Sequence, residues 1–116
     1  DETTGEELTP LAHSSSRRVF SEQTAEKLQE LLAGVVAEGT GRQAAPSEGT
    51  AAGKTGTAQT GQFRDGEELK NYWFAGFYPA EKPRWTIVVM QDAQTEPEVS
   101  SAAVFARLCD ALSAGE

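Results

Sequence analysis

Lysine, threonine and glycine stand together at positions 54 to 57, inside the glycine-rich segment Gly49–Gly61. The lysine supplies a positive charge and Thr55 and Thr57 supply hydroxyl donors, so the three side chains can together hold a carboxylate. Gly56 has no side chain where a ligand would lie against the strand, and a backbone N–H there can stabilise an oxyanion. The segment by itself is also compatible with a solvated lysine in a glycine-rich turn.

The Gly53-Lys54-Thr55 sequence could instead belong to a phosphate-binding loop. That pattern requires a glycine five positions before Gly53, where this chain has Glu48, and a helix directly after the lysine. The following residues, TGTAQTG, are poor helix formers, and Glu48 would place a negative charge where phosphate should lie. A carboxylate-binding strand edge is therefore favoured over a phosphate loop.

Composition excludes several other classes of function. The 116 residues carry a formal net charge of −8, with a pI of about 4.6, which argues against a nucleic-acid binder or an anionic membrane surface as partner. One cysteine, Cys109, and one histidine, His13, cannot form an internal disulfide or a His/Cys metal cluster. We interpret Cys109 as a buried structural thiol and His13 as a bystander in a polar segment.

Two amphipathic helices are predicted, one before and one after the strand-forming region. Residues 1–20 form a flexible polar lead-in, and residues 21–38 form a helix that Ser21 caps. Residues 96–113 form a second helix, with Thr95 opening a capping box that Glu98 completes. The apolar stripes expected to be buried are Leu28, Leu31, Leu32, Val35 and Val36 on the first helix, and Phe105, Leu108, Cys109 and Leu112 on the second.

Three strands are expected between the helices, at residues 50–59, 71–78 and 84–91. The last two, NYWFAGFY and RWTIVVMQ, are apolar on both alternating faces, which predicts that both faces are covered. Residues 61–71 read as a polar connection with a turn at RDG, and its acidic residues, Asp65, Glu67 and Glu68, as solvated side chains rather than paired catalytic carboxylates. The expected fold class is α+β, an antiparallel sheet of about three strands with helices on both faces.

The stretch AEGTGRQAAPSEGTAAGKTGTAQTG, followed by NYWFAGFYPAEKPRWTIVVM, resembles the C-terminal part of penicillin-binding protein transpeptidase domains of the monofunctional class B type. The matched features are Gly39-Thr40-Gly41 after a helix, the Ala52–Ala58 segment around the lysine, and Trp73–Phe77 followed by Pro79. A hydrophobic strand and a terminal helix come after them. The resemblance covers residues 21–112 and implies a β-lactamase/transpeptidase-like fold.

The resemblance also implies a serine enzyme with three motifs, Ser-x-x-Lys, Ser-x-Asn and Lys-Thr-Gly. By analogy, Lys54 and Thr55 would hold the carboxylate of the substrate or of a β-lactam. Thr57 would add its hydroxyl and an oxyanion-hole N–H, and Gly56 would leave room. The first two motifs are absent, so no catalytic residue is expected in this chain. The residues three positions before its four lysines are Thr24, Ala51, Glu67 and Pro79, and Leu69 stands two positions before the single asparagine.

These features lead to the interpretation that residues 21–116 are the C-terminal portion of a peptidoglycan D,D-transpeptidase domain, cut from a longer parent. The resemblance implies that the parent binds a peptidoglycan stem peptide or a β-lactam, needs no metal or organic cofactor, and works outside the cytoplasmic membrane from an N-terminal anchor. The chain itself shows no targeting segment. A nucleophile-free module that binds peptidoglycan or a protein is the alternative. The strand at 84–91 is expected to leave an edge open to self-association.

Overall fold

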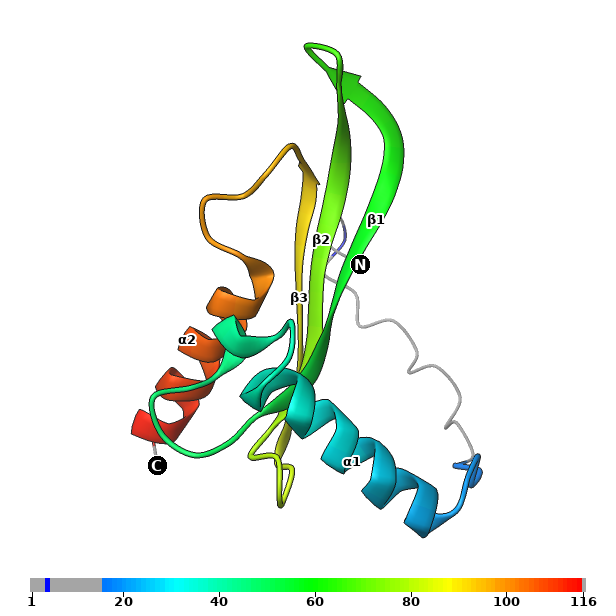
Figure 1. Ribbon diagram of the computed structural model, residues 1–116, viewed down its shortest axis with the longest axis vertical. Coiled ribbons are helices and arrows are strands. Elements are labelled where there is room, and N and C mark those ends of the chain that lie inside the picture. The colour runs from blue at the N-terminus through cyan, green and yellow to red at the C-terminus, as the bar shows by residue number, and fades with distance from the viewer. Residues whose placement is uncertain (1–3, 5–15, 116) are drawn as a thin grey trace.

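The computed structural model describes residues 4 and 16–115, so most of the predicted lead-in, including His13, lies outside the described residues. Figure 1 shows a long twisted sheet with a helix on one side and a second helix across its lower end. In chain order the elements are α1 (Glu22–Ala37), a short 3₁₀ turn η1 (Arg42–Ala44), β1 (Ala52–Arg64), β2 (Glu67–Tyr78), β3 (Trp85–Gln94) and α2 (Ser101–Ala114).

The sheet is antiparallel with the order β1-β2-β3, which confirms the expected α+β class with three strands and two helices. The strands are longer than predicted, because β1 and β2 continue to a tight turn at Asp65 and Gly66. Both turn residues have positive φ, 53° and 84°, the conformation that a two-residue hairpin needs. The prediction of a polar connection over residues 61–71 was therefore wrong, since most of it is strand. The register shifts between Gln59 and Phe63.

The core lies between the sheet and α2. Phe74 and Phe105 are fully buried, and their ring centroids are 4.6 Å apart. Cys109 is also fully buried, as expected. The buried cluster consists of Val36, Ala44, Ala51, Phe74, Tyr78, Ala102, Phe105 and Cys109, with Trp85, Ile87 and Val89 packed against it.

The opposite face of the sheet is open. Trp73, Val88 and Met90 are 38%, 58% and 45% exposed, so the prediction that both faces are covered was wrong within the described part of the chain. The physical reason is the position of α1, which lies across the lower end of the sheet and extends beyond it rather than covering this face (Figure 1).

Helix α1 begins as predicted, with Ser21 Oγ accepting a hydrogen bond from the Thr24 N–H at 3.2 Å. Its apolar stripe is not buried as predicted. Val36 is the one buried residue of the helix, while Leu28 and Leu31 are 43% and 59% exposed. The difference follows from the same position of α1, whose C-terminal end alone reaches the core.

Helix α2 begins at Ser101, five residues later than predicted, and Ser100 rather than Thr95 is its N-cap. The Ser100 side chain accepts from the Ala103 N–H at 3.1 Å. Contacts to the sheet keep the preceding residues out of the helix. Ser101 Oγ donates to the Tyr72 carbonyl at 2.8 Å, and Gln91 Nε2 donates to the Val99 carbonyl at 2.9 Å.

Candidate functional site

The Lys54–Thr57 segment lies on β1. The strand order β1-β2-β3 puts this strand at an edge of the sheet. The exposed Lys54 side chain turns along this edge toward its neighbour. Its ammonium Nζ donates to the Thr55 carbonyl at 3.0 Å and to Thr55 Oγ1 at 3.2 Å. A positive charge and a hydroxyl donor therefore lie side by side, as two groups that hold one carboxylate must.

The backbone of Thr57 is directed toward the free edge of the sheet. The Thr55 carbonyl, two residues earlier on β1, accepts from the exposed Lys54 Nζ at 3.0 Å. Because backbone groups two residues apart in a strand point to the same side, this contact indicates that the backbone groups of Thr55 and Thr57 both face the free edge. An outward N–H at Thr57 is available to a ligand.

Two glycines of this strand have different roles. Gly56 pairs with Trp73, and a Cβ added to it would meet only the Trp73 Cβ, at an ordinary 3.5 Å. A Cβ at Gly53 would instead lie 2.6 Å from the Phe74 ring and 2.7 Å from the Ala75 carbonyl oxygen. Gly53 is thus required for packing, while Gly56 leaves open space beside the lysine.

Thr55 and Thr57 also line a small cavity of about 140 Å³ that sequence reasoning did not predict. Gln43, from the turn after α1, and Ser100, at the start of α2, also line it, and Ser100 Oγ donates to Gln43 Oε1. No local pattern could have revealed these two residues, because 57 positions separate them in the sequence. Its polar atoms belong to neutral hydroxyl and amide groups, and most of its lining surface is apolar.

The remaining candidates have structural explanations. Glu68 accepts from Gln59 Nε2 at 2.8 Å and from the Gly61 N–H at 3.1 Å, so this carboxylate holds the irregular end of the β1–β2 hairpin. Burial raises the pKa of the Cys109 thiol to about 11, and the neighbouring Asp110 charge adds to the effect, which leaves the thiol unreactive near neutral pH.

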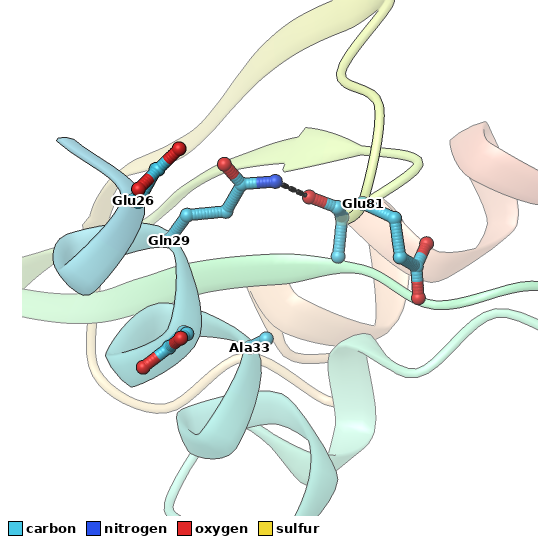
Figure 2. Close-up of a pocket in the computed structure, with 6 residues that line it drawn as sticks. Glu26, Gln29, Ala33 and Glu81 are labelled. Atoms are coloured by element: carbon cyan, nitrogen blue, oxygen red, sulfur yellow. Dashed lines mark hydrogen bonds between the residues drawn. The ribbon is translucent and has the colours of Figure 1, made fainter. Parts of the chain in front are cut away.

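A larger cavity of about 340 Å³ lies between α1 and the β2–β3 connection, away from the Lys54–Thr57 segment. Figure 2 shows its lining, with Gln29 Nε2 donating to the Ala80 carbonyl across it and the Glu26 and Glu81 side chains nearby. Over residues 16–115, no group of three or more His, Cys, Asp or Glu side chains is placed to hold a metal ion. None of the helices described is both long and apolar enough to cross a bilayer.

Comparison with known proteins places this geometry in context. Residues 7–110 match the family model of the penicillin binding protein transpeptidase domain. The chain is 41% identical over 81 residues to stage V sporulation protein D of Bacillus subtilis (strain 168), covering 67% of the chain and 12% of that protein. It is also 41% identical over 90 residues to penicillin-binding protein PbpB of Mycolicibacterium smegmatis, covering 66% and 13%.

Solved structures give the same answer. The transpeptidase domain of Burkholderia pseudomallei penicillin-binding protein 3 superposes with a TM-score of 0.74 at 30% identity, covering 88% of this chain and 33% of that one. A D,D-transpeptidase domain from Eggerthella lenta gives a TM-score of 0.62 at 36% identity, covering 82% and 21%. The chain therefore spans about an eighth of the two curated relatives and a third of the Burkholderia domain.

Proposed function

The chain belongs to the penicillin-binding protein transpeptidase domain family, and from this premise we propose that its Lys54–Thr57 segment is the carboxylate-binding wall of a peptidoglycan D,D-transpeptidase site. The observation that carries the proposal is the 3.2 Å contact between Lys54 Nζ and Thr55 Oγ1 on the free edge of the sheet. An ammonium and a hydroxyl at this spacing can both donate to the same carboxylate group.

Each residue of the segment has a distinct proposed role. Lys54 supplies the charge that attracts the C-terminal carboxylate of a D-Ala-D-Ala stem peptide or the carboxylate of a β-lactam. Thr55 and Thr57 donate hydroxyl hydrogen bonds that orient it. The outward N–H of Thr57 stabilises the oxyanion that forms when a nucleophile attacks the scissile carbonyl, and Gly56 lets the ligand lie against the strand.

The nucleophile has to come from outside this sequence. In the proposed reaction, a serine hydroxyl attacks the D-Ala-D-Ala carbonyl, releases D-alanine, and passes the acyl group to an amine on a neighbouring strand. This chain contains neither Ser-x-x-Lys nor Ser-x-Asn. Orientation and electrostatic stabilisation are therefore its contribution, and they give little rate enhancement without the serine.

The same family membership supports a proposal for the cellular setting of the parent. We propose that it cross-links peptidoglycan outside the cytoplasmic membrane, where an N-terminal anchor would hold it. Whether the sequence encoded upstream of Asp1 contains Ser-x-x-Lys and Ser-x-Asn separates this function from the alternative of a nucleophile-free binding module. An upstream sequence without both motifs would favour the binding module.

The proposed role of Lys54 can be tested in a hybrid domain, in which this chain is joined to a transpeptidase-domain segment that carries Ser-x-x-Lys and Ser-x-Asn. The wild-type hybrid should be acylated by a fluorescent penicillin. Lys54→Ala should lower the acylation rate at least about tenfold, which corresponds to roughly 1.4 kcal/mol, without lowering the melting temperature. Lys82→Ala, which removes an exposed lysine from the β2–β3 connection, is the matched control. Equal acylation of the two variants would exclude a substrate role for Lys54.

A further inference from the structure

The cavity beside Thr55 and Thr57 is lined by neutral groups. None of the described residues that line it is Asp, Glu, His, Lys or Arg. Its volume of about 140 Å³ is smaller than the roughly 300–1,000 Å³ of pockets that enclose a whole small ligand. The cavity therefore fits one end group of a larger molecule.

Several polar side chains of this lining are already bonded to other parts of the chain. Tyr72 Oη donates to the Thr95 carbonyl, and Ser101 Oγ donates to the Tyr72 carbonyl at 2.8 Å. Ser100 Oγ donates to Gln43 Oε1. These bonds join β2, η1 and the start of α2 around the cavity, and they leave the groups involved with little to offer a ligand.

Donor groups nevertheless remain on Thr55, Thr57 and Gln43. Thr55 Oγ1 accepts from Lys54 Nζ at 3.2 Å, so its own hydroxyl proton stays available. The Thr57 hydroxyl and the Gln43 Nε2 group form no hydrogen bond with any other described residue. The cavity thus offers hydrogen-bond donors from β1 and from η1, with no carboxylate among its lining residues to accept them.

The backbone at Gln43 is anchored on both sides. The Gly41 N–H donates to the Val35 carbonyl at 3.0 Å, which ties the start of η1 to the end of α1. Ala44, the last residue of η1, is fully buried in the core. A side chain that starts from an anchored backbone is a precise donor, because little reorganisation is needed when a ligand binds.

Ser100 also fixes which atom of the Gln43 side chain remains available. As the N-cap of α2, Ser100 Oγ accepts from the Ala103 N–H at 3.1 Å, and it gives its single proton to Gln43 Oε1. The acceptor atom of the Gln43 amide is therefore occupied. Its Nε2 is left with N–H groups, which recognise an acceptor such as a carboxylate oxygen.

We propose that Gln43 is a further ligand-binding residue, whose Nε2 donates to the carboxylate held by the Lys54–Thr57 segment. A terminal carboxylate has about four lone-pair positions, enough for donors from both elements. The apolar remainder of the lining strengthens such hydrogen bonds, because the local dielectric constant is low. This inference rests on the proposed function and assigns Gln43 to the carboxylate end of the stem peptide or β-lactam.

NMR of side-chain amide groups tests this contact in the chain itself. The ligand is N-acetyl-D-alanyl-D-alanine, and its methyl ester, which has no carboxylate, is the matched control. The Gln43 amide signals, assigned by their loss in Gln43→Glu, should shift with the acid and move at least about fivefold less with the ester. The amide signals of Gln29, which lines the separate cavity at α1, should respond to neither.

The backbone N–H of Thr57 reports on the proposed function in the same titration. A Thr57 response without a Gln43 response would overturn this inference and leave the carboxylate wall in place. Equal Gln43 shifts with acid and ester would also overturn it, because the group recognised would not be the carboxylate. The absence of both responses would contradict the inference and the proposed function together.

Acylation of the hybrid domain gives a second measurement. Gln43→Glu keeps the shape of the side chain but places a negative charge beside the ligand carboxylate. The rate of acylation by penicillin at about pH 7 should therefore fall at least about tenfold. Gln23→Glu, which adds the same charge at an exposed position in the first turn of α1, should leave the rate unchanged.

The pH dependence of the Gln43→Glu rate separates a charge effect from a structural one. The introduced carboxyl group has an ordinary pKa of about 4.3, and the negative charge of the ligand raises that pKa further. Lowering the pH from about 7 to about 5 should therefore restore the rate, relative to wild type, at least about threefold. A ratio that does not change with pH would overturn the inference, while Lys54→Ala measured alongside reports separately on the proposed function.

Discussion

Lys54 Nζ lies 3.2 Å from Thr55 Oγ1, although successive residues of a strand direct their side chains to opposite faces. The long lysine side chain overcomes this alternation by turning around the free edge of β1, where its ammonium also contacts the Thr55 carbonyl at 3.0 Å. The edge position of β1 is therefore a condition for the proposed site, because a paired neighbour strand would occupy the space that the ammonium uses.

The isolated chain should not form a stable covalent adduct with penicillin. It holds the proposed carboxylate wall but lacks Ser-x-x-Lys, so binding is not followed by acyl transfer. Incubation with a fluorescent penicillin, followed by intact mass measurement, checks this. A stoichiometric, hydrolysable adduct on any serine would refute the assignment of the chain as a partial domain.

Two glycine-to-alanine changes should separate packing from ligand binding. Gly76→Ala places a Cβ 2.4 Å from the Ala52 carbonyl oxygen and 2.9 Å from the Phe105 ring, so it should destabilise the isolated chain by about 2–3 kcal/mol. Gly56→Ala meets only the Trp73 Cβ at 3.5 Å and should leave stability within about 0.5 kcal/mol. Urea unfolding of both variants measures the difference, and similar losses would contradict it.

The same Gly56→Ala change should act on function in the hybrid domain. A methyl group there would stand where we propose that the ligand lies against β1, so acylation by penicillin should slow at least about fivefold while the fold is retained. Stopped-flow acylation kinetics, with circular dichroism as the check on folding, provide the measurement. An unaffected rate would show that the ligand does not approach this glycine.

Alkaline pH should destabilise the chain through Cys109. Burial raises the pKa of this thiol to about 11 from an ordinary value of 9.0. Between these values the unfolded chain releases its thiol proton while the folded chain retains it. The free energy of unfolding should therefore be unaffected below pH 9 and should fall by roughly 1–3 kcal/mol as the pH rises to 11.

The matched control for this pH effect is Cys109→Ala, which keeps every other ionisable group. Its unfolding free energy should fall less steeply over the same range, although the cavity lowers its overall stability. Parallel pH profiles for the two proteins would argue against a titrating thiol at this site.

The outer edge of β3 should make the isolated chain self-associate. The strand lies at the end of the sheet, and its central residues, Ile87 to Met90, are apolar and uncharged, unlike the charged or interrupted edges that prevent pairing. Sedimentation velocity at rising concentration should show growing species, with slowed hydrogen exchange in this strand. A strict monomer whose outward amides exchange freely would show that this edge does not pair.

The amino-acid sequence by itself determined the local features of this protein. Aromatic and β-branched runs specified β2 and β3, Ser21 specified the start of α1, and Lys54–Thr57 with Trp73–Phe77 specified the family, which the comparisons confirm. The placement of Cys109 on a buried helix face also followed from periodicity. All of these depend on residues within one or two turns or one strand, where the relevant interactions are local.

Tertiary structure alone decided how these elements meet. Helix α2 begins at Ser101 because that side chain bonds to Tyr72, 29 positions earlier, and this contact overrides a plausible capping box upstream. The Gln43–Ser100 contact and the exposure of Trp73 beside Lys54 likewise depend on which elements pack together. A periodic apolar pattern indicates that one face of an element favours burial. It does not indicate which other element covers that face, because the hydrophobic effect is not directional.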